Sequence, residues 1–190
     1  MDAAHARGAR VTAHAGYAGG ARVGAEAGVD ALEHGFELEA DTAATMARTG
    51  VRLVSTLSVM SSWRTFGRTT TLPRFAADEG RARIEARRER AMASVAVARR
   101  AGVAVSTGTD FGGGSTRANQ LAWEVEHLVE AGFEPWEALG CATWRGGELL
   151  GEPDAGVLRE GGPADLVLVH GDPLSDPRAL WRAWHASWSA

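Results

Sequence analysis

The chain has 190 residues, which suits one globular domain but falls short of the ~250 residues typical of a closed (β/α)8 barrel. Its 24 acidic and 20 basic side chains give a net charge of only −4, so we expect neither a nucleic-acid nor a membrane partner. All basic residues are arginine, and the missing lysine excludes a Walker A loop, a Schiff-base lysine and a lysine general base.

Short apolar runs alternate with helix-like segments along the chain, as in repeated βα units. We predict strands over residues 10–14, 29–34, 51–57, 103–110, 156–158 and 164–169. We predict helices over residues 20–27, 39–49, 73–100, 119–130 and 135–150. Gly28, Gly50 and Gly102 follow three of these helices, where a C′ glycine is common. The alternation favours an α/β fold with a parallel sheet and right-handed crossovers.

Polar side chains stand at the ends of three predicted strands: His14, His34 and Asp110. The carboxyl ends of parallel strands converge on one face, and two imidazoles with one carboxylate are a plausible ligand set for a catalytic metal. Each residue also has an ordinary interpretation. A single strand-end histidine can hydrogen-bond a neighbouring loop, and Asp110 can cap the turn before Gly112-Gly113-Gly114.

The residues around these positions carry a family resemblance. The matching segments are Val11 to Ala15, Glu26 to Gly35, Gly108 to Asp110, Leu128 to Phe133, Glu137 to Leu139, Glu148 to Gly151 and Gly161 to Val169 with Gly171-Asp172-Pro173. Together they resemble the second half of the metal-dependent amidohydrolase superfamily, in the branch of imidazolonepropionases and Xaa-Pro dipeptidases.

That resemblance implies a partial TIM (β/α)8 barrel, strands five to eight, followed by short β-sandwich strands. Residues 1–151 would be the C-terminal half of the barrel. Residues 152–175 would return to a small β-sandwich, and 176–190 would form a tail of uncertain order. The implied activity is hydrolysis of C–N bonds in amides, cyclic amides or dipeptides by metal-activated water.

The resemblance also implies roles for single residues. His14, His34 and Asp110 would bind a divalent metal, zinc in the first place, with one or two ions in the complete enzyme. Asp110 would in addition carry the proton of the attacking water. Thr56 and Ser58 would contact substrate, although ordinary strand-end hydroxyls are an equally good interpretation of both.

The departures from the family pattern limit this hypothesis. The family also uses a His-x-His pair on strand one and, in binuclear members, a carboxylated lysine on strand four. No two of the six histidines here lie two apart, and no lysine occurs. We therefore expect the chain alone to be inactive. The alternative is a catalytically dead half-barrel remnant or interaction scaffold.

Four strands cannot close a barrel, so exposed edges and an apolar inner face should favour a homo-oligomer or pairing with a missing N-terminal half. The single cysteine, Cys141, favours a reducing, cytoplasmic location, and we interpret it as a small buried hydrophobe. The other histidines, His5, His127, His170 and His185, are expected on helices or the surface. The charged segment 74–90 is expected to be a solvated helix face.

Overall fold

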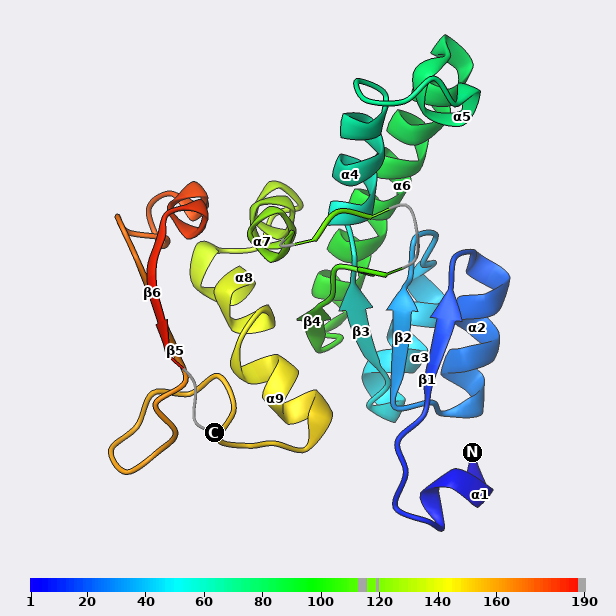
Figure 1. Ribbon diagram of the computed structural model, residues 1–190. Helices are drawn as coiled ribbons and strands as arrows, with labels where there is room; N and C mark the ends of the chain where they lie inside the picture. The colour runs from blue at the N-terminus through cyan, green and yellow to red at the C-terminus, as the bar shows by residue number, and fades with distance from the viewer. Residues whose placement is uncertain (113–115, 119, 188–190) are drawn as a thin grey trace.

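A four-stranded parallel sheet forms the centre of the computed structural model, which describes residues 1–112, 116–118 and 120–187 (Figure 1). Its strands are β1 (Thr12–Ala15), β2 (Ala31–His34), β3 (Arg52–Ser55) and β4 (Val105–Thr107), paired in that order. The predicted parallel sheet is thus confirmed, with shorter strands than the sequence indicated. Gly113 and Gly114 of the predicted turn, residue 119 at the start of a predicted helix and residues 188–190 of the predicted tail lie outside the described residues.

Helices connect the strands and extend the chain beyond the sheet. They are α1 (Asp2–His5), α2 (Ala18–Ala27), α3 (Ala40–Thr49), α4 (Ser58–Phe66), α5 (Pro73–Ala76), α6 (Asp78–Ala101), α7 (Leu121–Glu130), α8 (Pro135–Cys141) and α9 (Trp144–Leu150). Gly28, Gly50 and Gly102 follow α2, α3 and α6 with φ of 68°, 78° and 78°, which confirms their role as C-terminal caps. Within the described part of the chain, no helix combines the length and hydrophobicity needed to cross a membrane.

The two faces of the sheet differ in chemistry. Leu32, Leu53 and Val105 stand side by side in the register, and all three are buried in the core beneath α2, α3 and α6. The alternating row, which points the other way, contains His14, Glu33, Val54 and Ser106. The prediction of an apolar inner face is therefore wrong, because charged and polar side chains occupy most of this row.

Two predicted helices are each divided in the structure. The segment 73–100 breaks at Ala77, whose backbone is extended, with φ −73° and ψ 153°. Gly80 then passes so close to α5 that a Cβ there would lie 2.4 Å from the carbonyl oxygen of Pro73. The segment 135–150 is likewise split into α8 and α9. Helix α4, between β3 and α5, was not predicted at all.

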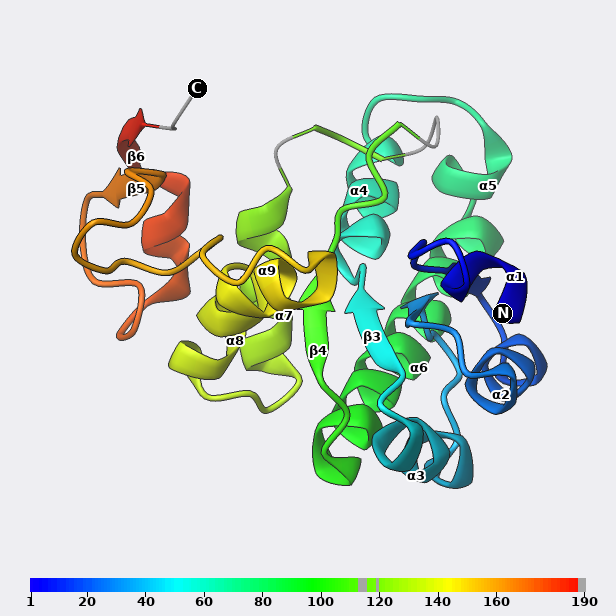
Figure 2. The same ribbon diagram turned by 90° about the horizontal axis from the view of Figure 1, so that it is seen from below.

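A small antiparallel sheet lies at the C-terminal end, across α7–α9 from the parallel sheet (Figures 1 and 2). Its strands are β5 (Leu166–Val169) and β6 (Ala183–Ser187), with a 3₁₀ helix, η1 (Pro177–Trp181), between them. The strand predicted at 164–169 is confirmed. The one predicted at 156–158 is wrong, since turn and irregular backbone occupy these residues. The segment expected to be a tail instead contains η1 and β6.

Candidate active site

Two of the predicted metal ligands lie against each other at the carboxyl ends of neighbouring strands. His14 is the third residue of β1, and His34 is the last residue of β2. Their ring centroids are 4.7 Å apart, with the ring planes at 70°. His14 is exposed, whereas only 9% of the His34 surface is accessible. The pair therefore presents one open and one sheltered imidazole on the same edge of the sheet.

Thr56 holds the ring of His34. The Nδ1 atom of His34 lies 2.7 Å from Thr56 Oγ1, and both residues are buried. When Nδ1 carries the proton and donates it to the hydroxyl, Nε2 keeps its lone pair for another partner. Burial is the main cause that lowers the pKa of His34 from 6.5; the charge of Asp110 opposes this shift, and smaller electrostatic interactions with His14 and Arg87 add to it. The lowered pKa favours the neutral form of His34, which is the form that binds a metal ion.

His34 and Asp110 share an unusual backbone conformation. Among the described residues they are the two non-glycine positions with positive φ, 73° and 52°. This left-handed conformation costs an L-residue roughly 1–2 kcal/mol, and such strained residues cluster at functional sites. His34 is the last residue of β2, and Asp110 stands three residues beyond the end of β4, so both strained positions lie at the carboxyl ends of strands.

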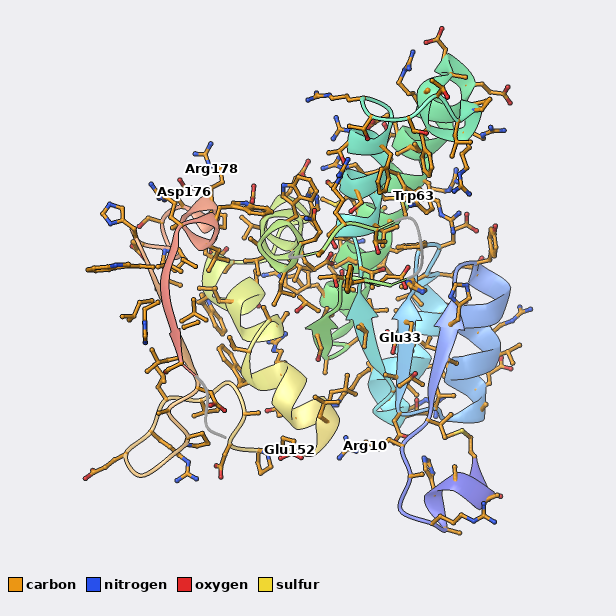
Figure 3. The ribbon with its side chains drawn as sticks, in the orientation of Figure 1. Arg10, Glu33, Trp63, Glu152, Asp176 and Arg178 are labelled. Atoms are coloured by element: carbon orange, nitrogen blue, oxygen red, sulfur yellow. The ribbon has the colours of Figure 1, made fainter. Side chains whose placement is uncertain are left out.

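Asp110 lies near the same edge but does not join the histidines in a complete ligand set. The charge of Asp110 favours the protonated form of His34. The pKa of Glu33, on the face of the sheet (Figure 3), is raised mainly by burial and to a smaller extent by the charge of Asp110. The side chain of Asp110 is exposed, and its carbonyl oxygen accepts a 2.7 Å hydrogen bond from Thr116. In the described part of the chain, no three His, Cys, Asp or Glu side chains form a group that could hold a metal ion. Metal binding by Asp110 stays a prediction.

The two predicted substrate contacts are buried. Thr56 follows β3 and is engaged with His34, as described above. Ser58 does not end a strand but begins α4, and its backbone N–H donates to Glu124 Oε2 at 2.7 Å. Contact of either residue with substrate remains untested.

Glu124 is a buried residue of this region that the sequence analysis missed. Its carboxylate accepts hydrogen bonds from Ser55 Oγ at 2.5 Å and from the backbone of Leu57 at 2.9 Å, besides that of Ser58. Complete burial raises its pKa, against the effect of these bonds. A signal existed in the sequence, because Glu124 stands on the apolar face of its helix, one turn from Leu121 and Leu128.

The remaining single residues behave largely as expected. Cys141 is 1% exposed, and burial raises the pKa of its thiol to about 11, which fits the interpretation as a small hydrophobe. His127 lies on α7 and bonds Ser61 Oγ at 2.6 Å. His5 bonds Asp30 at 2.9 Å, beside the start of β1. None of these histidines lies at the edge where His14 and His34 meet.

Two proteins of similar sequence and one solved structure each match nearly the whole of this chain. An uncharacterized protein of Mycobacterium tuberculosis is 37% identical over 185 residues, covering 95% of this chain and 46% of that protein. The ochratoxinase of Aspergillus niger is 28% identical over 182 residues, covering 92% of this chain and 36% of the enzyme. The crystal structure of a Xaa-Pro dipeptidase with bound methionine superposes with a TM-score of 0.81 and 27% identity, covering 96% of this chain and 44% of the dipeptidase.

The chain thus spans less than half the length of each of these proteins. The model of the amidohydrolase family matches residues 1–184, which is nearly the whole chain. The predicted family is confirmed, and the chain belongs to the amidohydrolase family.

Proposed function

We propose that this chain is the C-terminal half of a metal-dependent amidohydrolase that cleaves the C–N bond of a small amide, cyclic amide or dipeptide. The observation that carries the proposal is the pairing of His14 with His34, whose Nδ1 is held by Thr56. We infer that β1 to β4 correspond to strands five to eight of a TIM barrel. The likeness to a dipeptidase and to ochratoxinase supports an amide substrate.

The histidine pair fits two positions of a metal site. Imidazole nitrogen suits zinc, and a neutral His34 with a free Nε2 meets the requirement for ligation. A divalent ion held by His14 and His34 would supply a water of lowered pKa and polarise the scissile carbonyl.

Asp110 would take the proton of the attacking water. As the water oxygen bonds to the carbonyl carbon, the C–N bond breaks and the Asp110 carboxyl passes this proton to the leaving nitrogen. The exposed position of Asp110 beside His34 and Glu33 supports this role.

Two further proposals concern the state of the protein. Because the described residues form no group of three metal-binding side chains and the chain has no lysine, we propose that the 190-residue chain alone does not turn over substrate. The remaining metal-binding groups would come from a missing N-terminal half or from another copy of the chain. We place the protein in the cytoplasm. The absence of a group of three metal-binding side chains from the described residues also favours the second candidate, a catalytically dead half-barrel remnant that serves as a scaffold.

Equilibrium dialysis against zinc tests the site. We expect zinc binding by the wild type and its loss in His34→Ala, whereas His127→Ala, altered outside the candidate site, should retain it. Equal zinc content in wild type and His34→Ala contradicts the site. Dipeptides and N-acyl amino acids should then be hydrolysed only by a form extended upstream through the same reading frame. An extended form that binds zinc without hydrolysis favours the scaffold.

A further inference from the structure

Helices α4 and α7 pack against each other, and their contact contains a hydroxyl, an imidazole and a carboxylate that the candidate active site does not use (Figure 1). The Oγ atom of Ser61, on α4, lies 2.6 Å from Nε2 of His127, on α7. The Nδ1 atom of the same imidazole lies 3.2 Å from Oε2 of Glu130, one turn further along α7. The three side chains therefore follow one another in the order of a serine, histidine and acid triad.

The two ring nitrogens of His127 have different partners, and this difference assigns their roles. The Glu130 carboxylate only accepts hydrogen bonds, so Nδ1 carries the ring proton and donates it to Glu130. Nε2 then keeps its lone pair and accepts the hydrogen bond from the Ser61 hydroxyl. This is the tautomer in which an imidazole can remove the proton of a serine hydroxyl.

The charges around the imidazole favour the same state. Arg88, on α6, donates to Glu130 Oε2, and this hydrogen bond is the main cause that lowers the pKa of Glu130. Burial lowers the pKa of His127, against the opposing hydrogen bond from Glu130. A neutral imidazole beside an ionised carboxylate is the resting state of a general base.

Ser61 also borders a surface cavity. The cavity measures about 260 Å³ and follows one face of α4, where it is lined by Ser61, Arg64, Thr65 and Arg68. Only 8% of the Ser61 surface is accessible, so a reactant would approach the hydroxyl through this cavity.

The arginines of this cavity suit a developing negative charge. Arg64 Nε pairs with Glu85 at 2.8 Å, whereas no carboxylate pairs with the exposed Arg68 in the part of the chain that the structure describes. A guanidinium supplies hydrogen-bond donors only, and it carries a positive charge. A carbonyl oxygen that becomes negative as Ser61 attacks its carbon would therefore lie near cationic donors.

We propose that Ser61, His127 and Glu130 form a second, metal-independent site that transfers the acyl group of a small carboxylic ester to Ser61 Oγ and then to water. His127 Nε2 takes the Ser61 proton while Oγ bonds to the carbonyl carbon. The C–O bond to the alcohol breaks and His127 passes the proton to the leaving oxygen, which gives an acyl-serine and a free alcohol. Water then attacks the acyl carbon by the same route, releases the acid and restores the Ser61 hydroxyl. Glu130 is a positioning residue, because it acts through His127.

Acyl transfer from p-nitrophenyl acetate tests this site separately from the proposed amide hydrolysis. The reaction is run with a chelator, so that no metal-dependent hydrolysis contributes. Absorbance follows the release of p-nitrophenol, and mass spectrometry of peptides after an acid quench locates the acetyl group. We expect an acetylated Ser61 in the wild type and none in Ser61→Ala. His127→Gln should slow the release by roughly 100-fold or more, as the loss of a general base does.

Glu130 needs a test that separates orientation of the imidazole from folding. Glu130→Gln should slow the release by roughly tenfold or more, and Glu130→Asp, which keeps the negative charge, should recover part of the lost rate. Circular dichroism would verify that each variant is folded.

Ser62→Ala is the matched control. Ser62 is the next residue of α4, and its hydroxyl accepts from the Arg117 backbone at 3.3 Å instead of contacting a histidine. This variant should keep the wild-type rate. A wild type without acetylated Ser61, or an unchanged rate in folded His127→Gln, overturns the assignment. Neither result depends on zinc binding at His14 and His34, so the proposed amide hydrolysis stands or falls separately.

Discussion

The imidazole Nδ1 of His34 lies 2.7 Å from the hydroxyl of Thr56, and this hydrogen bond joins the ends of two neighbouring strands. His34 closes β2, and Thr56 is the first residue after β3. Glu124 binds the residues on both sides of Thr56, through Ser55 Oγ and the Leu57 backbone. The orientation of His34 is thus tied through Thr56 to a carboxylate on α7, which makes the candidate site dependent on groups distant in the sequence.

Thr56→Val removes the hydroxyl while keeping the shape of the side chain. Without the hydrogen bond, His34 loses its fixed orientation and tautomer, and zinc affinity should fall by roughly 10–100-fold. Competition with a chromophoric chelator measures the affinity. Thr56→Ser keeps the hydroxyl and should stay close to the wild type. An unchanged affinity in Thr56→Val would show that His34 is oriented by other contacts.

Stability should depend on pH through His34. Its pKa lies below 6.5 in the folded chain because burial disfavours the charged ring. Between that lowered pKa and 6.5 the unfolded chain binds more protons, so the free energy of unfolding rises with pH across this window. Acidification through the window should destabilise the wild type more than His34→Gln. Urea unfolding at a series of pH values measures this.

The control for that series is His185→Gln, at an exposed position of β6. It should follow the wild type at every pH. A His34→Gln curve parallel to that of the wild type would mean that His34 titrates in the folded chain as it does in the unfolded one.

Glu124→Gln should destabilise the fold by about 1–3 kcal/mol, because the amide group would face the Ser58 N–H with a donor instead of an acceptor. Glu124→Leu should cost more, since all three donors would lose their partner. Denaturant unfolding gives both values. Glu126→Gln on the same helix keeps an acceptor for Trp181 Nε1 and should change stability little. Equal effects at 124 and 126 would contradict the described bonds.

The sequence was informative where the local pattern decides the structure. Apolar runs that end in a polar residue located β1 and β2, and with them His14 and His34. Prediction from the sequence failed at α4, because the run from Val51 to Leu57 looks like one strand. The strand ends at Ser55, and the Leu57 and Ser58 amides that follow bind Glu124, more than 60 residues later in the chain. Such a tertiary contact has no local signature.

Two other features were hidden for similar reasons. Strand β6 is exposed along most of its length, so its residues show no apolar alternation, and backbone pairing with β5 defines it. The contact of Ser61 with His127 was hidden because Ser61 lies on the unpredicted α4, 66 residues before its partner. Only the packing of α4 against α7 brings the hydroxyl to the imidazole.

The packing of α2 against β2 gives a last test with a matched pair of glycines. A Cβ on Gly24 would lie 2.4 Å from Leu32 Cδ2, whereas a Cβ on Gly19 would meet nothing within 4 Å. Gly24→Ala should therefore destabilise the fold by about 1–3 kcal/mol through overpacking. Gly19→Ala, in the same helix, should be neutral or stabilise it by up to about 1 kcal/mol. Thermal and urea unfolding would compare the two variants.

Shortening the facing side chain identifies the cause. If the contact with Leu32 is responsible, Leu32→Val should make room for the new methyl group. Gly24→Ala should then cost less in that background than in the wild type. The cost of Gly19→Ala should not change there. An equal cost of Gly24→Ala in both backgrounds would mean that glycine is required at this position for the backbone of α2, and that Leu32 does not set the distance between the helix and the sheet.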